Sequence, residues 1–156
     1  MDPSQHYSQS PFLMYVDTAL EEWREGYARI GLILRPHHLN RSGVVHGGVV
    51  ATLMDHAGGF SGLYCTTPGK KRYGTTLSLT TSFIQQRRSG KILAIGHLMP
   101  GGGRKIFYAN SEVRAENGAL LATGAGVYRY RSGSESSAGI SHPPFADGSS
   151  PDDRSA

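Results

Sequence analysis

Apolar residues recur at helical spacing in two segments of the chain, and each pattern predicts an amphipathic helix. The first segment runs from Phe12 to Glu25. The second follows a His-Gly-Gly turn and ends near Cys65, before a Thr-Thr-Pro-Gly breaker, so it predicts a helix of about four turns. The apolar face of this second helix consists of Val50, Leu53, Met54, Ala57, Ser61 and Tyr64.

Runs with strand-like apolar patterns predict a sheet beside the second helix. The first run, residues 27–34, stops before Pro36, which lacks the N–H that a sheet ladder needs. Short glycine-containing turns separate the later runs, so we predict that these form an antiparallel meander. The later runs are residues 75–85, 91–99, 105–114 and 119–131. The pattern as a whole predicts an α+β fold, in which the long second helix covers one face of the sheet.

Length and composition divide the chain into one domain and two loose ends. With 156 residues the chain is long enough for one domain with a real core. We predict that the domain spans residues 12–131, that residues 1–11 are flexible and that residues 132–156 form a disordered tail. The tail is rich in Ser, Gly, Pro and Asp, so it has too few large apolar residues to offset chain entropy.

The charge pattern argues against a nucleic-acid-binding arm. The formal net charge is +4, and Lys and Arg are scattered apart from short clusters at 70–72, 87–88 and 104–105. The single cysteine, Cys65, excludes an intramolecular disulfide, and we interpret it as structural. The N-terminus lacks the apolar region of a signal peptide, and no apolar run reaches about 18 residues. We therefore predict a cytoplasmic protein with no nucleic-acid or membrane partner.

The turn before the second helix and the carboxylate of Asp55 carry the most informative chemistry. Backbone N–H groups at a helix N-terminus lack intrahelical partners and carry the positive end of the helix dipole, so Gly47 and Gly48 are placed to polarise a carbonyl. Asp55 is the nearest carboxylate able to activate water or to attack a carbonyl carbon. Asn40 can donate a further hydrogen bond, although shaping the turn is its simpler role. For His46 we favour orientation of the turn over proton transfer.

Small residues surround Asp55 on its face of the predicted second helix. Each interior glycine costs about 1 kcal/mol relative to alanine, so this face needs a compensating role. Small residues let a ligand or another backbone approach closely, and Asp55 is the functional group among them. Tight packing against a sheet or a partner helix, without chemistry, is the alternative. The small residues are Ala51, Gly58, Gly59 and Gly62.

Two further groups of residues carry weaker signals. The turn ending in Gly103, Arg104 and Lys105 lacks Walker spacing and is predicted to be a hairpin turn, although its two cations are able to contact a cofactor phosphate. The residues of the types that bind metals lack the spacing of familiar zinc motifs, so we predict no metal site. These residues are His37, His38, His46, Asp55 and His56.

Residues 26–131 resemble the hotdog-fold acyl-CoA thioesterases, specifically the phenylacetate-pathway and thioesterase superfamily member 2 types. The resemblance implies an antiparallel sheet wrapped around a long central helix. It also implies subunits that join their sheets as a homodimer, and often a dimer of dimers, which is a homotetramer. The residues that carry it are Asn40, Gly43, His46-Gly47-Gly48, Asp55, the strand from Thr75 to Ile84 and the Gly103-Arg104-Lys105 turn.

The resemblance also implies roles for individual residues. The Gly47 N–H would polarise a thioester carbonyl with help from Asn40, and Asp55 of the partner subunit would act as general base or nucleophile. Thr76 aligns with a hydroxyl position that in some relatives positions water. No cofactor would be required, because coenzyme A is part of the substrate. The cations expected near its phosphates are Arg87, Arg88, Arg104 and Lys105, with Gly103 in the same turn.

One departure from the family pattern follows the strand at 75–85. Many relatives have an aromatic-x-x-Pro pattern there, whereas this chain reads Phe83-Ile84-Gln85-Gln86-Arg87-Arg88. Hydrolysis of an acyl-CoA thioester is the function that the resemblance implies. Two alternatives stay open: a non-catalytic acyl-CoA-binding or sensing module, which has little need for Asp55, and a hotdog hydratase or dehydratase, which would use His46 with Asp55.

Overall fold

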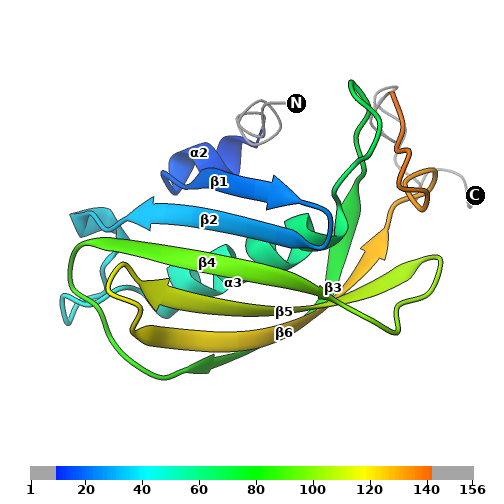
Figure 1. Cartoon of the computed structure of the whole chain (residues 1–156). Helices are drawn as coiled ribbons and strands as arrows, with labels where there is room; N and C mark the ends of the chain where they lie inside the picture. Colours follow the sequence, from blue (N-terminus) through cyan, green and yellow to red (C-terminus); the bar gives the residue numbers. More distant parts are fainter. Residues whose placement is uncertain (1–9, 142–156) are drawn as a thin grey trace, which may run out of the picture.

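The computed structural model describes residues 10–141, which form one antiparallel sheet of six strands packed on a long helix (Figure 1). The strand order is β1-β2-β4-β5-β6-β3. The helices are α2 (Pro11–Tyr15), the 3-10 turn η1 (Pro36–His38) and the long α3 (Gly47–Gly62). The predicted α+β architecture is confirmed. The strands are β1 (Ala19–Arg24), β2 (Tyr27–Ile33), β3 (Gly74–Phe83), β4 (Lys91–Met99), β5 (Ile106–Ala115) and β6 (Leu120–Tyr130).

Helix α3 lies on the inner face of the sheet and contacts every strand. Its apolar stripe, including Leu53 and Met54, is fully buried, as are alternate residues of the strands such as Ile92 and Val113. Full burial of such a side chain contributes about 1.5–3 kcal/mol, so this interface accounts for much of the core. In the described range, no helix has the length and hydropathy that crossing a membrane requires.

The predicted helix over residues 12–25 is wrong for most of its length. Only α2 is helical, and after Asp17, whose φ is +57°, the chain continues as strand β1 paired with β2. The register of this pair shifts between Leu20 and Glu22. Such a bulge adds one residue to the strand, so the three-residue spacing of Leu20 and Trp23 that suggests a helix fits this irregular strand as well.

Strand β3 lies at one edge of the sheet, contrary to the predicted meander. The strands β4, β5 and β6 are consecutive antiparallel neighbours, but β3 pairs with β6, and β4 pairs with β2. The loop 84–90 carries the chain across from β3 to β4 (Figure 1). Turn residues report that the chain changes direction, but not which strand becomes the neighbour. The meander prediction therefore holds for three strands and is wrong for β3.

Residues 132–141 fold back onto the loop that joins α3 to β3, in contrast to the disordered tail that the composition predicts. Lys71 and Ile140 form an isolated antiparallel bridge, and Ser134 is fully buried. Many of these contacts use backbone groups, which a composition rich in Ser and Gly does not reveal. Residues 1–9 and 142–156 of the predicted loose ends lie outside the described residues, so the division of the chain at residues 12 and 131 stays a prediction.

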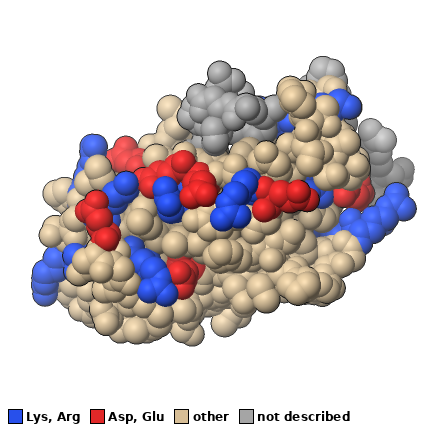
Figure 2. Space-filling view, in the orientation of Figure 1, with Lys and Arg blue, Asp and Glu red and all other residues tan. Residues whose placement is uncertain are grey.

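Charged side chains gather over β1 and β2, whereas the outer face of the sheet over β4, β5 and β6 is mostly uncharged (Figure 2). Among these charged side chains, Glu21 pairs with Lys91 at 2.7 Å and with Arg29 at 3.4 Å, and Glu22 pairs with Arg24 at 3.2 Å. Each exposed pair contributes only about 0–1 kcal/mol. These ion pairs therefore contribute little to the stability of the fold. The charges instead discourage a strand of another chain from pairing with this part of the sheet.

Candidate functional site

The N-terminus of α3 is shaped by His46, which is its N-cap residue. The His46 backbone is extended, and its Nδ1 accepts a hydrogen bond of 2.9 Å from the Gly48 N–H. This supports the interpretation of His46 as a residue that orients the turn. It corrects the expectation that Gly47 and Gly48 both polarise a carbonyl, because the Gly48 N–H already has a partner. Gly47 is left as the candidate donor at the positive end of the helix.

Asn40 builds the turn that leads into α3. Its Oδ1 accepts hydrogen bonds from the backbone N–H groups of Ser42 at 2.9 Å and Val44 at 3.4 Å. A backbone pair between Asn40 and Val44, at 2.8 Å, closes the same turn, and Gly43 has a φ of +71°, which suits glycine. The turn-shaping interpretation of Asn40 is confirmed. Any contact of Asn40 with a substrate would use its amide nitrogen.

Asp55 and Thr76 form a direct contact between the helix and the edge strand. The Thr76 hydroxyl donates a hydrogen bond of 2.7 Å to Asp55 Oδ1. Asp55 lies half-buried midway along α3, whereas Thr76 lies near the start of β3. A charge-assisted hydrogen bond of this length fixes the orientation of the carboxylate. The structure therefore joins two of the predicted catalytic residues, one from each element.

The backbone of Asp55 is held from the other side by the sheet. The buried Tyr128 hydroxyl donates a hydrogen bond of 3.2 Å to the Asp55 carbonyl oxygen, and the Ser111 hydroxyl donates one of 3.0 Å to the Met54 carbonyl. Burial raises the pKa of Tyr128, and the negative charge of Asp55 adds to the shift. These hydroxyls tie α3 to β5 and β6 at the level of Asp55, in addition to the non-directional apolar packing.

The small residues beside Asp55 divide into two groups. A Cβ added to Gly58 would meet the Tyr128 hydroxyl at 2.4 Å, and one added to Gly62 would meet the Phe107 ring at 2.2 Å. These two glycines are buried, so tight packing against the chain's own sheet accounts for them. Asp55 and Gly59 stay half-buried. The close approach predicted for this face is therefore made largely by the protein's own sheet.

Gly47 and Asp55 do not meet within one chain. Asp55 lies eight positions after Gly47 along the helix, which is about 12 Å at 1.5 Å per residue. A single carbonyl group cannot bridge that distance. If both residues act on one substrate, each of them must come from a different copy of the chain.

Phe83 is a candidate site residue that the sequence noted only as part of a departure from the family pattern. A Cβ added to Gly47 would lie 3.3 Å from the Phe83 ring, which is itself 60% exposed. The ring therefore stands beside the candidate carbonyl-polarising N–H and forms one wall of that position. The signal available in the sequence was an aromatic residue at the end of an uncharged strand.

The predicted phosphate-binding cations form two separate groups. The Arg88 guanidinium donates to the carbonyls of Ser42 at 3.1 Å and Gly43 at 3.4 Å, and the Arg87 carbonyl accepts from the Val45 N–H. Both arginines therefore flank the turn built by Asn40. Gly103, Arg104 and Lys105 lie exposed in the β4–β5 hairpin. Strand β4 separates the two groups by about 26 Å, so one chain does not bring them together.

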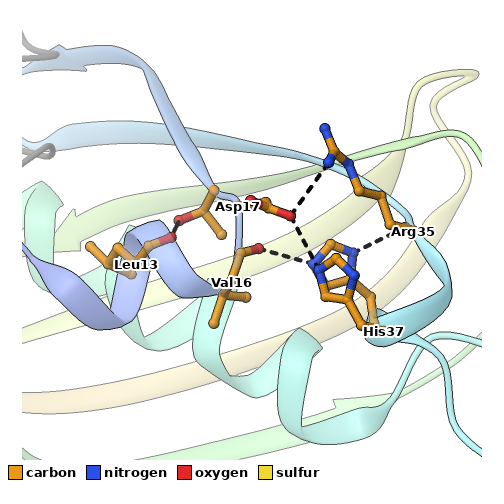
Figure 3. Close-up of polar contacts among 7 residues, drawn as sticks. Leu13, Val16, Asp17, Arg35 and His37 are labelled. Atoms are coloured by element: carbon orange, nitrogen blue, oxygen red, sulfur yellow. Dashed lines mark hydrogen bonds and ion pairs between the residues drawn. The ribbon is translucent and has the colours of Figure 1, made fainter.

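A cluster of Asp17, His37 and His38 joins the α2–β1 turn to η1 and has the composition of a metal site (Figure 3). His38 is buried, which lowers its pKa, and both of its ring nitrogens are in use. Its Nδ1 accepts from the Arg35 N–H at 3.0 Å, and its Nε2 donates to the Val16 carbonyl at 3.1 Å. His38 therefore has no lone pair for a metal. His37 Nε2 also forms a hydrogen bond of 3.1 Å with Asp17 Oδ2, so the cluster holds the α2–β1 turn against η1.

A hollow of about 520 Å³ opens on the outer face of the sheet, away from α3. It includes His97 and Asn110 and hydroxyl groups from β3 and β6, but none of the predicted site residues. The candidate chemistry lies on the inner face and along the β3 edge. This hollow is therefore not part of the candidate site.

Comparison with known proteins agrees with the fold and the motif. The sequence profile of the thioesterase superfamily matches residues 42–122, just over half of the chain. A protein of Archaeoglobus fulgidus, provisionally named an esterase, is 27% identical over 124 residues, which cover 79% of this chain and 77% of that protein.

Solved structures of bacterial proteins share the fold. A thioesterase from Haemophilus influenzae has a TM-score of 0.71 at 22% identity, over 82% of this chain and 87% of that one. The PaaI protein of the phenylacetic acid degradation operon of E. coli has a TM-score of 0.72 at 16% identity, over 83% and 91%. At such low identity these likenesses establish the fold alone.

Proposed function

The chain belongs to the thioesterase superfamily, and we propose that it hydrolyses an acyl-CoA thioester to a carboxylic acid and free coenzyme A. The observation that carries the proposal is the 2.7 Å contact between Asp55 and Thr76. It places an oriented carboxylate at the half-buried face of the central helix. A protein that only binds an acyl-CoA has little use for a carboxylate beside the carbonyl.

The proposed site is shared between two copies of the chain. Gly47 and Asp55 lie about 12 Å apart along α3, and Thr76 lies on β3, whose outer edge has no neighbouring strand in the described chain. Antiparallel pairing of two β3 edges is proposed to form a homodimer, in which Gly47 of one protomer faces Asp55 of the partner subunit. A dimer of dimers would be a further assembly of such pairs.

The proposed reaction divides the chemistry between the two protomers. The Gly47 N–H, with the Asn40 amide nitrogen, donates hydrogen bonds to the thioester oxygen and stabilises the negative charge that develops there. The Asp55 carboxylate, oriented by Thr76, either removes a proton from an attacking water or attacks the carbonyl carbon itself. In both routes a C–O bond forms, the C–S bond breaks and coenzyme A leaves as the thiol after taking up a proton. In the second route the acyl group is left on Asp55 as a mixed anhydride, which water then hydrolyses to the carboxylic acid and the free carboxylate.

Binding of the coenzyme A portion is assigned to the basic residues of two protomers. Arg87 and Arg88 lie beside the Asn40 turn, next to the proposed carbonyl position. Arg104 and Lys105 lie at the far end of β4. If two chains pair through β3, the hairpin of one copy is a candidate for completing the phosphate site of the other. Phosphates form strong charge-assisted hydrogen bonds with such cations.

A thiol-release assay over a panel of acyl-CoAs tests the proposal. Wild type is expected to turn over at least one aromatic, short-chain or medium-chain thioester. Asp55→Asn is expected to lower kcat by about 10²–10⁴-fold, the usual contribution of a positioned acid–base group. Glu116→Gln, which removes an exposed carboxylate from the β5–β6 turn, is the matched control and should keep wild-type activity.

Three outcomes would overturn the proposal in distinct ways. Acyl-CoA binding without release of thiol, measured by calorimetry, would favour the sensing module. Addition of water to an enoyl-CoA without thioester cleavage would favour a hydratase. Full thioesterase activity in Asp55→Asn would keep the reaction but refute the assigned carboxylate.

A further inference from the structure

Residues 132–141 and Arg72 form a polar cluster at the opposite end of α3 from Gly47, and we refer to it as the C-terminal clasp. Building on the proposed function, we propose that the clasp positions Asp55 and Thr76 relative to one another, with Arg72 as its central positioning residue. Neither Arg72 nor residues 132–141 fall among the predicted site residues.

Arg72 binds four backbone carbonyls from two separate parts of the chain. Its Nε and Nη2 donate to Ser134 and Glu135 at 3.0 and 3.1 Å, and its Nη1 donates to Gly62 and Tyr64 at 3.0 and 3.4 Å. The guanidinium also lies over the Tyr130 ring, with its Cζ 4.1 Å from the ring centroid, which is a cation–π contact. A planar group with five donors is suited to this task, and a lysine cannot reproduce it.

The first set of these contacts holds the C-terminal end of the helix that carries Asp55. Gly62 is the last residue of α3, and carbonyls in the last turn of a helix lack intrahelical partners. The Gly62 carbonyl accepts from Arg72 and also from the Tyr130 hydroxyl at 3.1 Å. A positive charge at this end of the helix is also favourable. The clasp therefore fixes the end of α3.

Other contacts of the clasp, made by residues 132–141 without Arg72, hold the beginning of the strand that carries Thr76. The buried Ser134 hydroxyl accepts a hydrogen bond of 3.0 Å from the Tyr73 N–H. Lys71 and Ile140 exchange two backbone hydrogen bonds of 2.9 and 2.8 Å. Both contacts lie within a few residues of Gly74, where β3 begins. The clasp therefore fixes the start of β3 as well.

The two elements meet again at the contact between Asp55 and Thr76. Gly62 lies seven positions after Asp55 along the helix, and Thr76 lies three positions after Tyr73 along the extended chain, which is about 10 Å in each case. Strand β3 has a ladder partner on one side only, and its register shifts between Thr76 and Ser78. The clasp supplies the support that this part of the ladder lacks. A misplacement of about 1 Å in an active site can cost about 10²-fold in rate.

Two truncations provide a matched test. A chain ending at Arg131 loses the clasp segment, and a chain ending at Ser141 keeps it and loses only residues beyond the described range. We expect the shorter chain to lose about tenfold in kcat with KM within twofold of wild type, and the longer one to match wild type. Equal kcat in the two truncations would overturn the proposal.

A double-mutant comparison separates positioning from general stability. If the clasp acts through Thr76, the truncation at Arg131 should lower kcat by less than twofold in a Thr76→Ala background. If the kcat losses of the truncation and of Thr76→Ala multiply in the combined variant, the assignment is refuted. If the short chain fails to fold, Arg72→Lys in the full chain tests the proposal instead. This variant keeps the positive charge and loses the guanidinium donors that bind several carbonyls at once. We expect it to lower kcat several-fold, and wild-type kcat would contradict the proposal.

Hydrogen–deuterium exchange gives a readout that needs no substrate. Amides of residues 74–78 should exchange faster in the Arg131 truncation than in the Ser141 truncation, even if no thioester is hydrolysed. An inactive wild type would therefore refute the proposed function alone. Unchanged exchange at residues 74–78 would refute the clasp.

Discussion

The two edges of the sheet differ in length, charge and exposure. Strand β1 has six residues and three of them are charged, whereas β3 has ten residues with no charge and no proline. The charged residues of β1 form ion pairs with one another and with residues of β2 and β4. Strand β3 instead exposes Leu77, which is 50% accessible, and Phe83. An edge strand with charges discourages pairing with another chain, and a long uncharged one invites it.

The β3 edge, unlike the β1 edge, lies beside the predicted site residues. Thr76 lies on the uncharged β3 edge and contacts Asp55, and Phe83 at the other end of β3 lies beside Gly47. All four residues therefore lie along or behind one edge. The β1 edge carries none of the predicted site residues. The proposed association and the proposed catalysis accordingly belong to the same side of the molecule.

A lysine in the β3 edge should produce the largest effect. If the proposed dimer forms through β3, Leu77→Lys is expected to give a monomer near 16.8 kDa and to lower thioesterase activity at least about 100-fold, because a shared site needs both copies. Light scattering coupled to size exclusion measures the mass. Glu22→Lys places the same residue in β1 and should leave mass and activity unchanged. A fully active Leu77→Lys monomer would refute the shared site.

Loss of one hydroxyl on the inner face of β3 should have the next largest effect. Thr76→Ala is expected to lower kcat about tenfold, because a hydrogen bond to a charged group is worth about 1.5–3 kcal/mol and this one is partly exposed. Ser78→Ala is the control, since Ser78 pairs with Val127 on the opposite face of the same strand. Steady-state kinetics on both variants measure the difference. Equal losses would show that β3 tolerates no change, rather than that Thr76 acts on Asp55.

Removing charge from β1 should change association more than stability. Glu22→Thr combined with Arg24→Thr makes β1 resemble β3, so we expect concentration-dependent species larger than those of wild type in sedimentation experiments. The free energy of unfolding should change by less than about 1 kcal/mol, because exposed ion pairs contribute little. If sedimentation matches wild type at all concentrations, the charges of β1 do not protect that edge.

An ion pair in a middle strand should act on stability alone, with the smallest effect. Hydrogen bonds of 2.6 and 2.9 Å from Arg114 lower the pKa of Glu112. A lowered pKa in the folded state stabilises the protein at neutral pH, and this stabilisation disappears as pH falls below the ordinary carboxyl value of 4.5. Arg114→Gln should therefore lower Tm by about 1–2 °C at pH 7. The difference should vanish at acid pH, with oligomer mass unchanged throughout.

The sequence predicts α3 and five of the six strands well, because each of them has regular periodicity. The run predicted at residues 91–99 has the same first and last residues as strand β4. Strand β1 is missed because its bulge imitates helical spacing, and the edge position of β3 is missed because neighbours in a sheet depend on the path of a loop. The local pattern contains neither kind of information.

The residues of the candidate site also differ in how clearly the sequence reveals them. Asn40, His46, Gly47 and Asp55 stand out because their types and spacing are unusual in one short stretch. The clasp escapes notice because Arg72 binds backbone carbonyls, and any residue can supply a carbonyl. The tail residues that provide them have no apolar pattern, so their packing becomes visible only in three dimensions.

The direction of the hydrogen bond between Thr76 and Asp55 has a consequence for what the proposed site can use as an attacking group. A hydroxyl has one proton, and Thr76 gives its proton to Asp55 Oδ1. Toward solvent both side chains then present only lone pairs. Water has two protons and can satisfy an acceptor on each side while turning its own lone pairs to a carbonyl, whereas an alcohol or a thiol has one. The pair therefore favours transfer of the acyl group to water over transfer to another acceptor.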